Sequence, residues 1–316
     1  MKDLLAIVFS PDFFYMWIRV VTPILLPALG AMVCNRAGVV NLGLEGIMLT
    51  AALFGVLGGA FGGGVIWGLL AGVGISLLLS LVFAYVHLNL RANNVLCGTA
   101  LNTFASGFTV FLLELLTDEK GTSSSLKSFS FPQVNIPFIE NIPVLGQIVS
   151  GHNLLTYIAV LAVFLISFLI YKTPLGIRIR TVGENEHAAS SVGINVNRVR
   201  YIAILICGLL TGLGGMYLST GYLNFFTRDM TAGRGFIALA AAPMGQNTPV
   251  GVLCASLIFA FFDGLANILQ VMRIPSEFVQ MLPYFATILG ITVYSIQRIR
   301  AERFKRRIRS RGKMKQ

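Results

Sequence analysis

Long apolar runs constrain the folding of this chain more than any other feature of its sequence. Nine of them fall near 13–34, 45–61, 65–87, 95–116, 154–171, 201–220, 235–246, 250–271 and 279–297. Most are long enough to cross a hydrocarbon core about 30 Å thick. Helices are the only open-chain structures that satisfy their own backbone hydrogen bonds in lipid. The runs therefore predict an all-α, polytopic membrane bundle with about 8–10 transmembrane segments.

The composition excludes an ordinary soluble domain. Only 12% of the residues are charged and 55% are hydrophobic, whereas soluble domains contain about 25% charged residues. The first apolar run has no basic stretch before it and no small-residue cleavage site after it, so we expect no cleavable signal sequence. We predict one transmembrane domain over 1–297 and a basic tail over 298–316.

The positive charge is concentrated in that tail and in one loop. The formal net charge is +11, and most of it lies in 298–316, while the loop 172–200 carries five Lys or Arg against two Glu. Because Lys and Arg are enriched in cytoplasmic loops, we expect the loop and the tail in the cytoplasm and the loop 117–152 outside. A basic tail directly after a span is more typical of contact with anionic lipid than of nucleic-acid binding.

The segment near 235–249 is the irregular part of this topology. An even number of crossings must separate the two basic regions, so the short run 235–246 has to contribute one. Pro243, Gly245 and Pro249 interrupt it, which predicts a short broken span or a re-entrant hairpin. The stretch 235–241 also resembles 46–52, and this similarity is either an inverted repeat around a binding site or a chance match.

No enzyme site is visible in the sequence. The three histidines are scattered, and neither a His-Glu-x-x-His motif, a Cys-x-x-Cys pair nor a Gly-rich phosphate loop is present. We therefore predict no catalytic residue, no metal site and no cofactor on this chain. If ATP drives the protein, another chain has to bind ATP and Mg²⁺.

Polar residues inside the apolar runs are candidates for a solute pathway. Glu45 begins a span after a polar break that contains Asn41. A carboxylate there either complements a helix N-terminus or acts in gating or in the pathway. Asp263 and Asn267 share a face of another span, as a structural pair or as a transport site. We identify no deep base beside Asp263, which favours a neutral solute.

A second candidate is a polar stripe on the run 95–116. Thr99, Asn102, Ser106 and Thr109 recur at spacings of three, four and three after Asn94. Amides and hydroxyls both donate and accept hydrogen bonds, which suits a neutral, hydroxyl-rich solute. The alternative is that the stripe binds a neighbouring helix.

The basic loop contains a short predicted helix over 184–193. Gly183 precedes it and Gly193 follows it, and glycine is typical of the residue after a helix end. Acidic residues at the start suit the positive end of a helix. Its predicted docking residues, for a soluble partner, are Glu184, Glu186, Ala188, Ala189, Val192 and Gly193.

Four segments in order resemble the permeases of ATP-binding-cassette (ABC) importers for branched-chain amino acids, simple sugars and nucleosides. They are RAGVVNLGLEGIML, NNVLCGTALN, GENEHAASSVGINVNRVRYIAI and TAGRGFIALAA. The first is most similar to the shorter of two paired purine-nucleoside-type permeases. His187 separates Glu186 from the Ala pair, and 244–249 reads MGQNTP where an aromatic is expected, so the match is looser at both places.

The resemblance implies a subunit of a nucleoside importer in the bacterial cytoplasmic membrane. A separate ABC ATPase would clamp the 184–193 helix, a second homologous permease would complete the pathway, and an extracytoplasmic binding protein or lipoprotein would deliver the solute. A sugar or branched-chain amino acid permease is one alternative. A stand-alone secondary transporter or channel is another, and it would transport without ATP.

Overall fold

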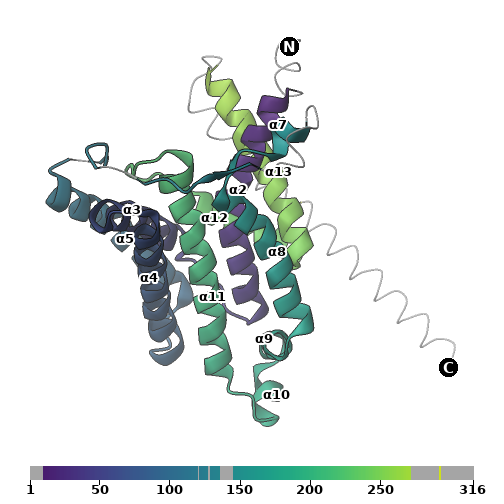
Figure 1. Cartoon of the computed structure of the whole chain (residues 1–316). Helices are drawn as coiled ribbons and strands as arrows, with labels where there is room; N and C mark the ends of the chain where they lie inside the picture. The colour runs from purple at the N-terminus through teal and green to yellow at the C-terminus, as the bar shows by residue number, and fades with distance from the viewer. Residues whose placement is uncertain (1–9, 120, 127–128, 136–144, 272–291, 293–316) are drawn as a thin grey trace.

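The protein is a bundle of apolar helices, as the sequence predicts (Figure 1). A computed structural model of the chain describes residues 10–119, 121–126, 129–135, 145–271 and 292. Within those residues, seven helices are long and apolar enough to cross a membrane, and Arg234–Met244 is a shorter apolar helix. The predicted span 279–297, except Thr292, and the tail 298–316 lie outside the described residues.

The elements follow the predicted apolar runs closely. The helices are α2 (Pro11–Arg36), α3 (Leu44–Gly62), α4 (Val65–Ala84), α5 (Asn94–Thr117), α7 (Leu145–Val149), α8 (Leu154–Lys172), α9 (Pro174–Glu184), α10 (Glu186–Ser191), α11 (Val196–Tyr217), α12 (Arg234–Met244) and α13 (Pro249–Val271). The π-helical turns η1 (Tyr85–Asn89) and η2 (Leu218–Tyr222) extend α4 and α11. Two short strands, β1 (Gln133–Val134) and β2 (His152–Asn153), pair antiparallel.

The core lies around α2, α3 and α11. In their most apolar stretches 83% of the α2 residues are buried, and 72% of those in α3 and in α11 with η2. The corresponding shares are 28% for α5, 33% for α4 with η1, and 39% for α8. In Figure 1, α4 and α5 lie on one flank of the bundle and α8 on the other. These flanking helices therefore leave apolar faces that the described part of the chain does not cover.

Small residues allow the helices to approach closely. A Cβ at Gly68 of α4 would lie 2.5 Å from the carbonyl oxygen of Gly55 in α3. A Cβ at Gly208 of α11 would collide with the Ser80 side chain of α4. Glycine at these contacts brings α3, α4 and α11 together over much of their length.

The two long loops lie at opposite ends of the bundle. Helices α9 and α10 are at the lower end in Figure 1, and α7 with the β1–β2 pair is at the upper end. The sides of the membrane on which the two loops lie stay a prediction. Helix α12 stops at Met244, directly after Pro243, so the interruption predicted near 235–249 is confirmed.

Candidate functional site

The N-termini of α3 and α12 meet inside the bundle at Glu45. One carboxylate oxygen of Glu45 accepts the Gly233 N–H at 2.8 Å, and the other accepts the Gly235 N–H at 2.7 Å. A Cβ at Gly235 would lie 2.7 Å from the Glu45 Cα, so only glycine permits this approach. Glu45 starts α3 and binds the free N–H groups that begin α12, where the helix dipole favours an anion.

The two similar stretches, 46–52 and 235–241, both begin at this junction. The Gly46 N–H donates to Asn102 Oδ1 at 2.8 Å, and the Gly235 N–H donates to Glu45. Each stretch therefore starts a helix whose first N–H groups are bound by a side chain from another position. Discontinuous helices that meet at their N-termini are a common arrangement around transporter pathways.

Asp263 of α13 is paired with Arg234 at the start of α12. Arg234 Nη2 lies 3.0 Å from Asp263 Oδ2, and the two side chains are 16% and 15% exposed. The expectation that no deep base accompanies Asp263 is therefore wrong, and the acid gives no information about the charge of a solute. Asn267, one turn further along α13, is half-buried.

The predicted polar stripe on α5 does not open onto one cavity. Asn102 Nδ2 donates to the Leu42 carbonyl at 2.9 Å while its oxygen accepts from Gly46. Ser106 Oγ donates to Asp229 Oδ1 at 3.1 Å, and Thr109 is buried. Asn102 thus has the structural role that the alternative interpretation described, and it joins α5 to the start of α3.

A neighbouring face of α5 is open instead. A groove of about 830 Å³ runs along it, lined by Leu96, Thr99, Ala100, Thr103, Phe104, Gly107, Phe108 and Phe111. The Phe104 and Phe108 rings stack at 5.1 Å with an interplanar angle of 14°. Of the predicted pathway residues only Thr99 lines this groove. The polar stripe did not reveal this face, and Phe104, Phe108 and Phe111 are apolar residues that are expected on any side of a membrane helix.

Asn41 and Asn94 organise the connection between α2 and α3. Asn41 is fully buried, and its Oδ1 accepts the Gly43 N–H at 3.0 Å. Asn94 Nδ2 donates to the Val40 carbonyl at 3.3 Å. Both side chains are engaged with backbone groups that have no helical partner, which is a structural role.

Helix α10 differs in detail from the predicted 184–193 helix. Glu184 ends α9, because Asn185 adopts an extended conformation and its side chain accepts the Ala188 N–H to begin a new helix at Glu186. Ala189 is fully buried, so it faces the bundle and cannot contact a partner, whereas Val192 is 72% exposed. Gly193 has φ +83°, and it follows the helix as predicted.

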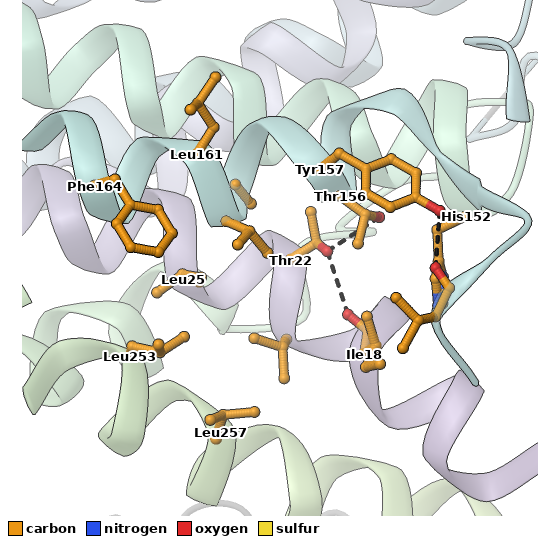
Figure 2. A pocket seen from close by; sticks show the side chains of 14 residues that line it. Ile18, Thr22, Leu25, His152, Thr156, Tyr157, Leu161, Phe164, Leu253 and Leu257 are labelled. Carbon is orange, nitrogen blue, oxygen red and sulfur yellow. Dashed lines mark hydrogen bonds between the residues drawn. The ribbon is translucent and has the colours of Figure 1, made fainter. Parts of the chain in front are cut away.

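An apolar cavity lies elsewhere, between α2, α8 and α13. Figure 2 shows this cavity of about 430 Å³, with Leu161, Phe164 and Leu253 along its walls. Its polar atoms gather at one end, where Thr22 Oγ1 donates to Thr156 Oγ1 at 3.3 Å. None of the predicted pathway residues lines it. Its lining suits hydrocarbon rather than a polar solute.

A polar pocket of about 320 Å³ lies at the α7 end of the bundle. It is lined by Tyr15, Arg19, Ser130, Phe131, Pro132, Gln133, Gly151, Asn153, Gly221, Tyr222 and Asn224. The Arg19 guanidinium lies 4.9 Å from the centre of the Tyr222 ring. His152 stacks on Tyr15 beside this pocket at 4.2 Å, and burial lowers the pKa of its imidazole. In the described part of the chain, no three His, Cys, Asp or Glu side chains are grouped to hold a metal.

The sequence matches the family model described as "Branched-chain amino acid transport system / permease component" over residues 13–291. The chain belongs to this family. The permease is 40% identical to the guanosine ABC transporter permease protein NupQ of Bacillus subtilis, with 85% of this chain and 88% of NupQ covered. It is 36% identical to the nucleoside ABC transporter permease protein NupC of Lactococcus lactis, with 86% and 89% covered.

A solved structure supports the fold of the permease. PsaBC from Streptococcus pneumoniae, determined in complex with Fab, aligns with a TM-score of 0.51 at 14% identity, covering 92% of this chain and 94% of the other. The likeness concerns the fold alone. Together with the seven apolar helices, these comparisons show a multi-pass membrane protein that is a permease component of an ABC transporter.

Proposed function

We propose that this permease imports nucleosides and is driven by a separate ABC ATPase that docks on α10. One observation carries the coupling part of the proposal. Helix α10 projects from the lower end of the bundle (Figure 1), with Val192 exposed and Ala189 buried. It is held on one side and accessible on the other, which is what a docking helix requires.

The coupling surface consists of the outward side of α10 and its flanks. Glu184, Glu186, Ala188 and Val192 are exposed, so a groove of the ATPase can receive them. Ala189 anchors the helix, and Gly193 allows the turn into α11. ATP and Mg²⁺ would bind the ATPase, whose closure on nucleotide would displace α10 relative to the spans.

Nucleosides are supported as the solute by the relatives and by the open groove on α5. Two relatives that share most of their length with this chain are named for guanosine and for nucleosides. The faces of Phe104 and Phe108 suit stacking with a base, and stacking on aromatic side chains tolerates different bases. The Thr99 and Thr103 hydroxyls in the same groove suit hydroxyl-rich solutes.

A second permease would form the opposite wall of this groove. The α5 face exposes Leu96, Phe104 and Phe111 at 68%, 53% and 63%, and the described residues provide no wall facing them. We propose that the two permeases enclose the pathway between them. An extracytoplasmic binding protein or lipoprotein would deliver solute at the α7 end, near the polar pocket of Arg19 and Tyr222.

A stand-alone ion-coupled transporter is less well supported. That interpretation needs Glu45 and Asp263 as ion or proton sites, but Glu45 binds two N–H groups of α12 and Asp263 pairs with Arg234. Permeation of a sugar or a branched-chain amino acid remains the alternative within the family.

Competition for uptake tests the solute. Cells that depend on this importer for guanosine uptake would be challenged with an excess of unlabelled adenosine, uridine, ribose or leucine. We expect the nucleosides to suppress guanosine uptake, and ribose and leucine to leave it unchanged. Suppression by leucine or ribose without suppression by nucleosides would assign the permease to the alternative solute classes.

A further inference from the structure

The segment Asn35–Gly38, which ends α2 and begins its connection to α3, contacts two parts of the permease that are far apart in sequence. One is the α9–α10–α11 region, which carries the docking helix. The other is the turn between α12 and α13, which follows the helix bound by Glu45.

On the docking side, Arg200 of α11 joins α10 to this segment. Its Nη2 lies 2.6 Å from Glu186 Oε2 in α10, and its Nε donates to the Ala37 carbonyl at 3.4 Å. The Arg200 side chain is 20% exposed and the Glu186 side chain 47% exposed, so the pair is partly open to solvent. One guanidinium therefore touches both the docking helix and the end of α2.

Helix α9 also contacts the Asn35–Gly38 segment, from the same side as Arg200. A Cβ at Gly183 would collide with the Arg36 carbonyl oxygen and would lie 3.1 Å from the Gly38 nitrogen. Backbone meets backbone here with no side chain between them. A shift of α9 and α10 toward α2 thus has no flexible side chain to absorb it.

On the other side, Asn35 and Arg36 hold the turn after α12. Arg36 Nε donates to the Asn247 carbonyl at 2.7 Å, and Asn35 Nδ2 donates to Asn247 Oδ1 at 3.1 Å. Asn247 has φ +50° and Gln246 has φ +56°. Left-handed conformations are uncommon for non-glycine residues, although Asn is enriched in them. The turn has its own backbone hydrogen bonds, from Gln246 to Pro243 and from Asn247 to Ala242, and the contacts of Asn35 and Arg36 add to these.

Both ends of α12 are thus bound to the stretch 35–45, which runs from the end of α2 to the first turn of α3. Its start is bound by Glu45, in the first turn of α3, and the turn after its end is bound by Asn35 and Arg36. Arg234 further ties its first residue to Asp263 of α13. Helix α12 is therefore expected to move with this stretch as one unit.

We propose that the Asn35–Gly38 segment relays the displacement of α10 to α12, with Arg36 as its main positioning residue. This inference rests on the proposed function. The six-residue α10 has no core of its own, so force on it has to pass through the groups it touches. Arg36 provides the shortest hydrogen bond between the segment and the α12–α13 turn. Its loss would leave the docking surface intact and weaken the transmission of movement.

The test compares Arg36→Gln with Arg91→Gln in proteoliposomes that contain the complete importer. Arg91 is exposed between η1 and α5, and its side chain makes no hydrogen bond or ion pair within the described residues. Three quantities are measured: ATPase co-purified with the permease, ATP hydrolysed, and nucleoside imported per ATP. For Arg36→Gln we expect import per ATP to fall about two- to thirtyfold, matching coupling energies of about 0.5–2 kcal/mol.

Co-purified ATPase should stay at the wild-type level, and Arg91→Gln should behave as wild type. Arg36→Lys should recover part of the loss, because Lys keeps a charged donor on a long side chain whereas Gln keeps only a neutral donor on a shorter one. Import per ATP that is unchanged in Arg36→Gln would overturn the relay. Proportionate loss of ATPase binding, hydrolysis and import would also overturn it, because that pattern indicates a purely structural role. If Arg36→Gln does not reach the membrane, Asn35→Ala is judged by the same criteria.

The outcome for the wild type separates this inference from the proposed function. Wild-type importer that shows no ATP-dependent nucleoside uptake would refute the proposed function. Wild-type uptake together with an unaffected Arg36→Gln would refute the relay alone.

Discussion

Individual polar residues in this bundle mostly bind backbone groups at helix ends. Glu45, Asn41 and Asn102 all accept N–H groups near the start of α3 or α12. Donors at helix starts have no partner within the helix, and in lipid an unsatisfied one is costly. A polar residue in a predicted span is therefore as much a marker of a broken helix as of a solute.

Glu45→Gln tests this interpretation at the α3–α12 junction. The amide replaces one acceptor oxygen with an NH₂ donor, so one N–H of α12 loses its acceptor at a cost of about 1–3 kcal/mol. We expect a lower thermal unfolding temperature for the purified permease. Glu184→Gln, at an exposed position, is the matched control and should unfold as wild type. Equal unfolding temperatures for Glu45→Gln and wild type would contradict the assignment.

At the scale of elements, α10 shows what sequence reasoning could and could not reach. A helix ending at Gly193 was predictable, because glycine has access to the left-handed conformation that ends helices. The inward orientation of Ala189 could not be predicted, because it depends on how α9 and α11 position α10. Likewise, Pro243 predicted the end of α12, but the Arg234–Asp263 pair depends on the packing of α12 against α13.

Val192→Asp tests α10 as the docking element. Val192 is 72% exposed, so a charge there should not disturb the fold, whereas it should be unfavourable in an apolar groove of the ATPase. We expect co-purification of the ATPase to fall by about tenfold or more, corresponding to about 1.4 kcal/mol. The matched control is Val250→Asp, since Val250 is 64% exposed at the start of α13.

The two variants should reach the membrane in equal amounts. ATPase retained by Val192→Asp at the level of Val250→Asp would remove α10 from the docking surface. If Ala189 contacted the partner, as the sequence analysis expects, Ala189→Arg would be the variant that tests docking. With Ala189 fully buried, that change is expected to disrupt α10 itself and cannot test docking.

At the scale of the whole molecule, the described helices are unevenly covered by one another. Helices α2, α3 and α11 are well covered, but α5 exposes a groove with stacked aromatic rings. The all-α bundle was predictable from the apolar runs. The sequence did not predict which face of α5 is open. Helices in lipid are largely apolar on every side, so their periodicity does not mark the covered face.

Phe104→Ala tests the groove as the nucleoside path. Base stacking on an aromatic side chain contributes about 1–3 kcal/mol, so we expect the nucleoside concentration for half-maximal import to rise by about fivefold or more. Phe168→Ala is the control, because Phe168 is 62% exposed on α8 and lies outside the groove. An equal response of the two variants would exclude a role of Phe104 in the path.

The most direct test of the central claim is nucleoside uptake by proteoliposomes of defined composition. The permease would be reconstituted alone, with its second permease, and with the second permease, the ATPase and the delivery protein together. We predict guanosine accumulation only in the complete assembly and only with ATP and Mg²⁺ on the ATPase side. Accumulation by this chain alone without ATP would contradict it and would identify a stand-alone transporter.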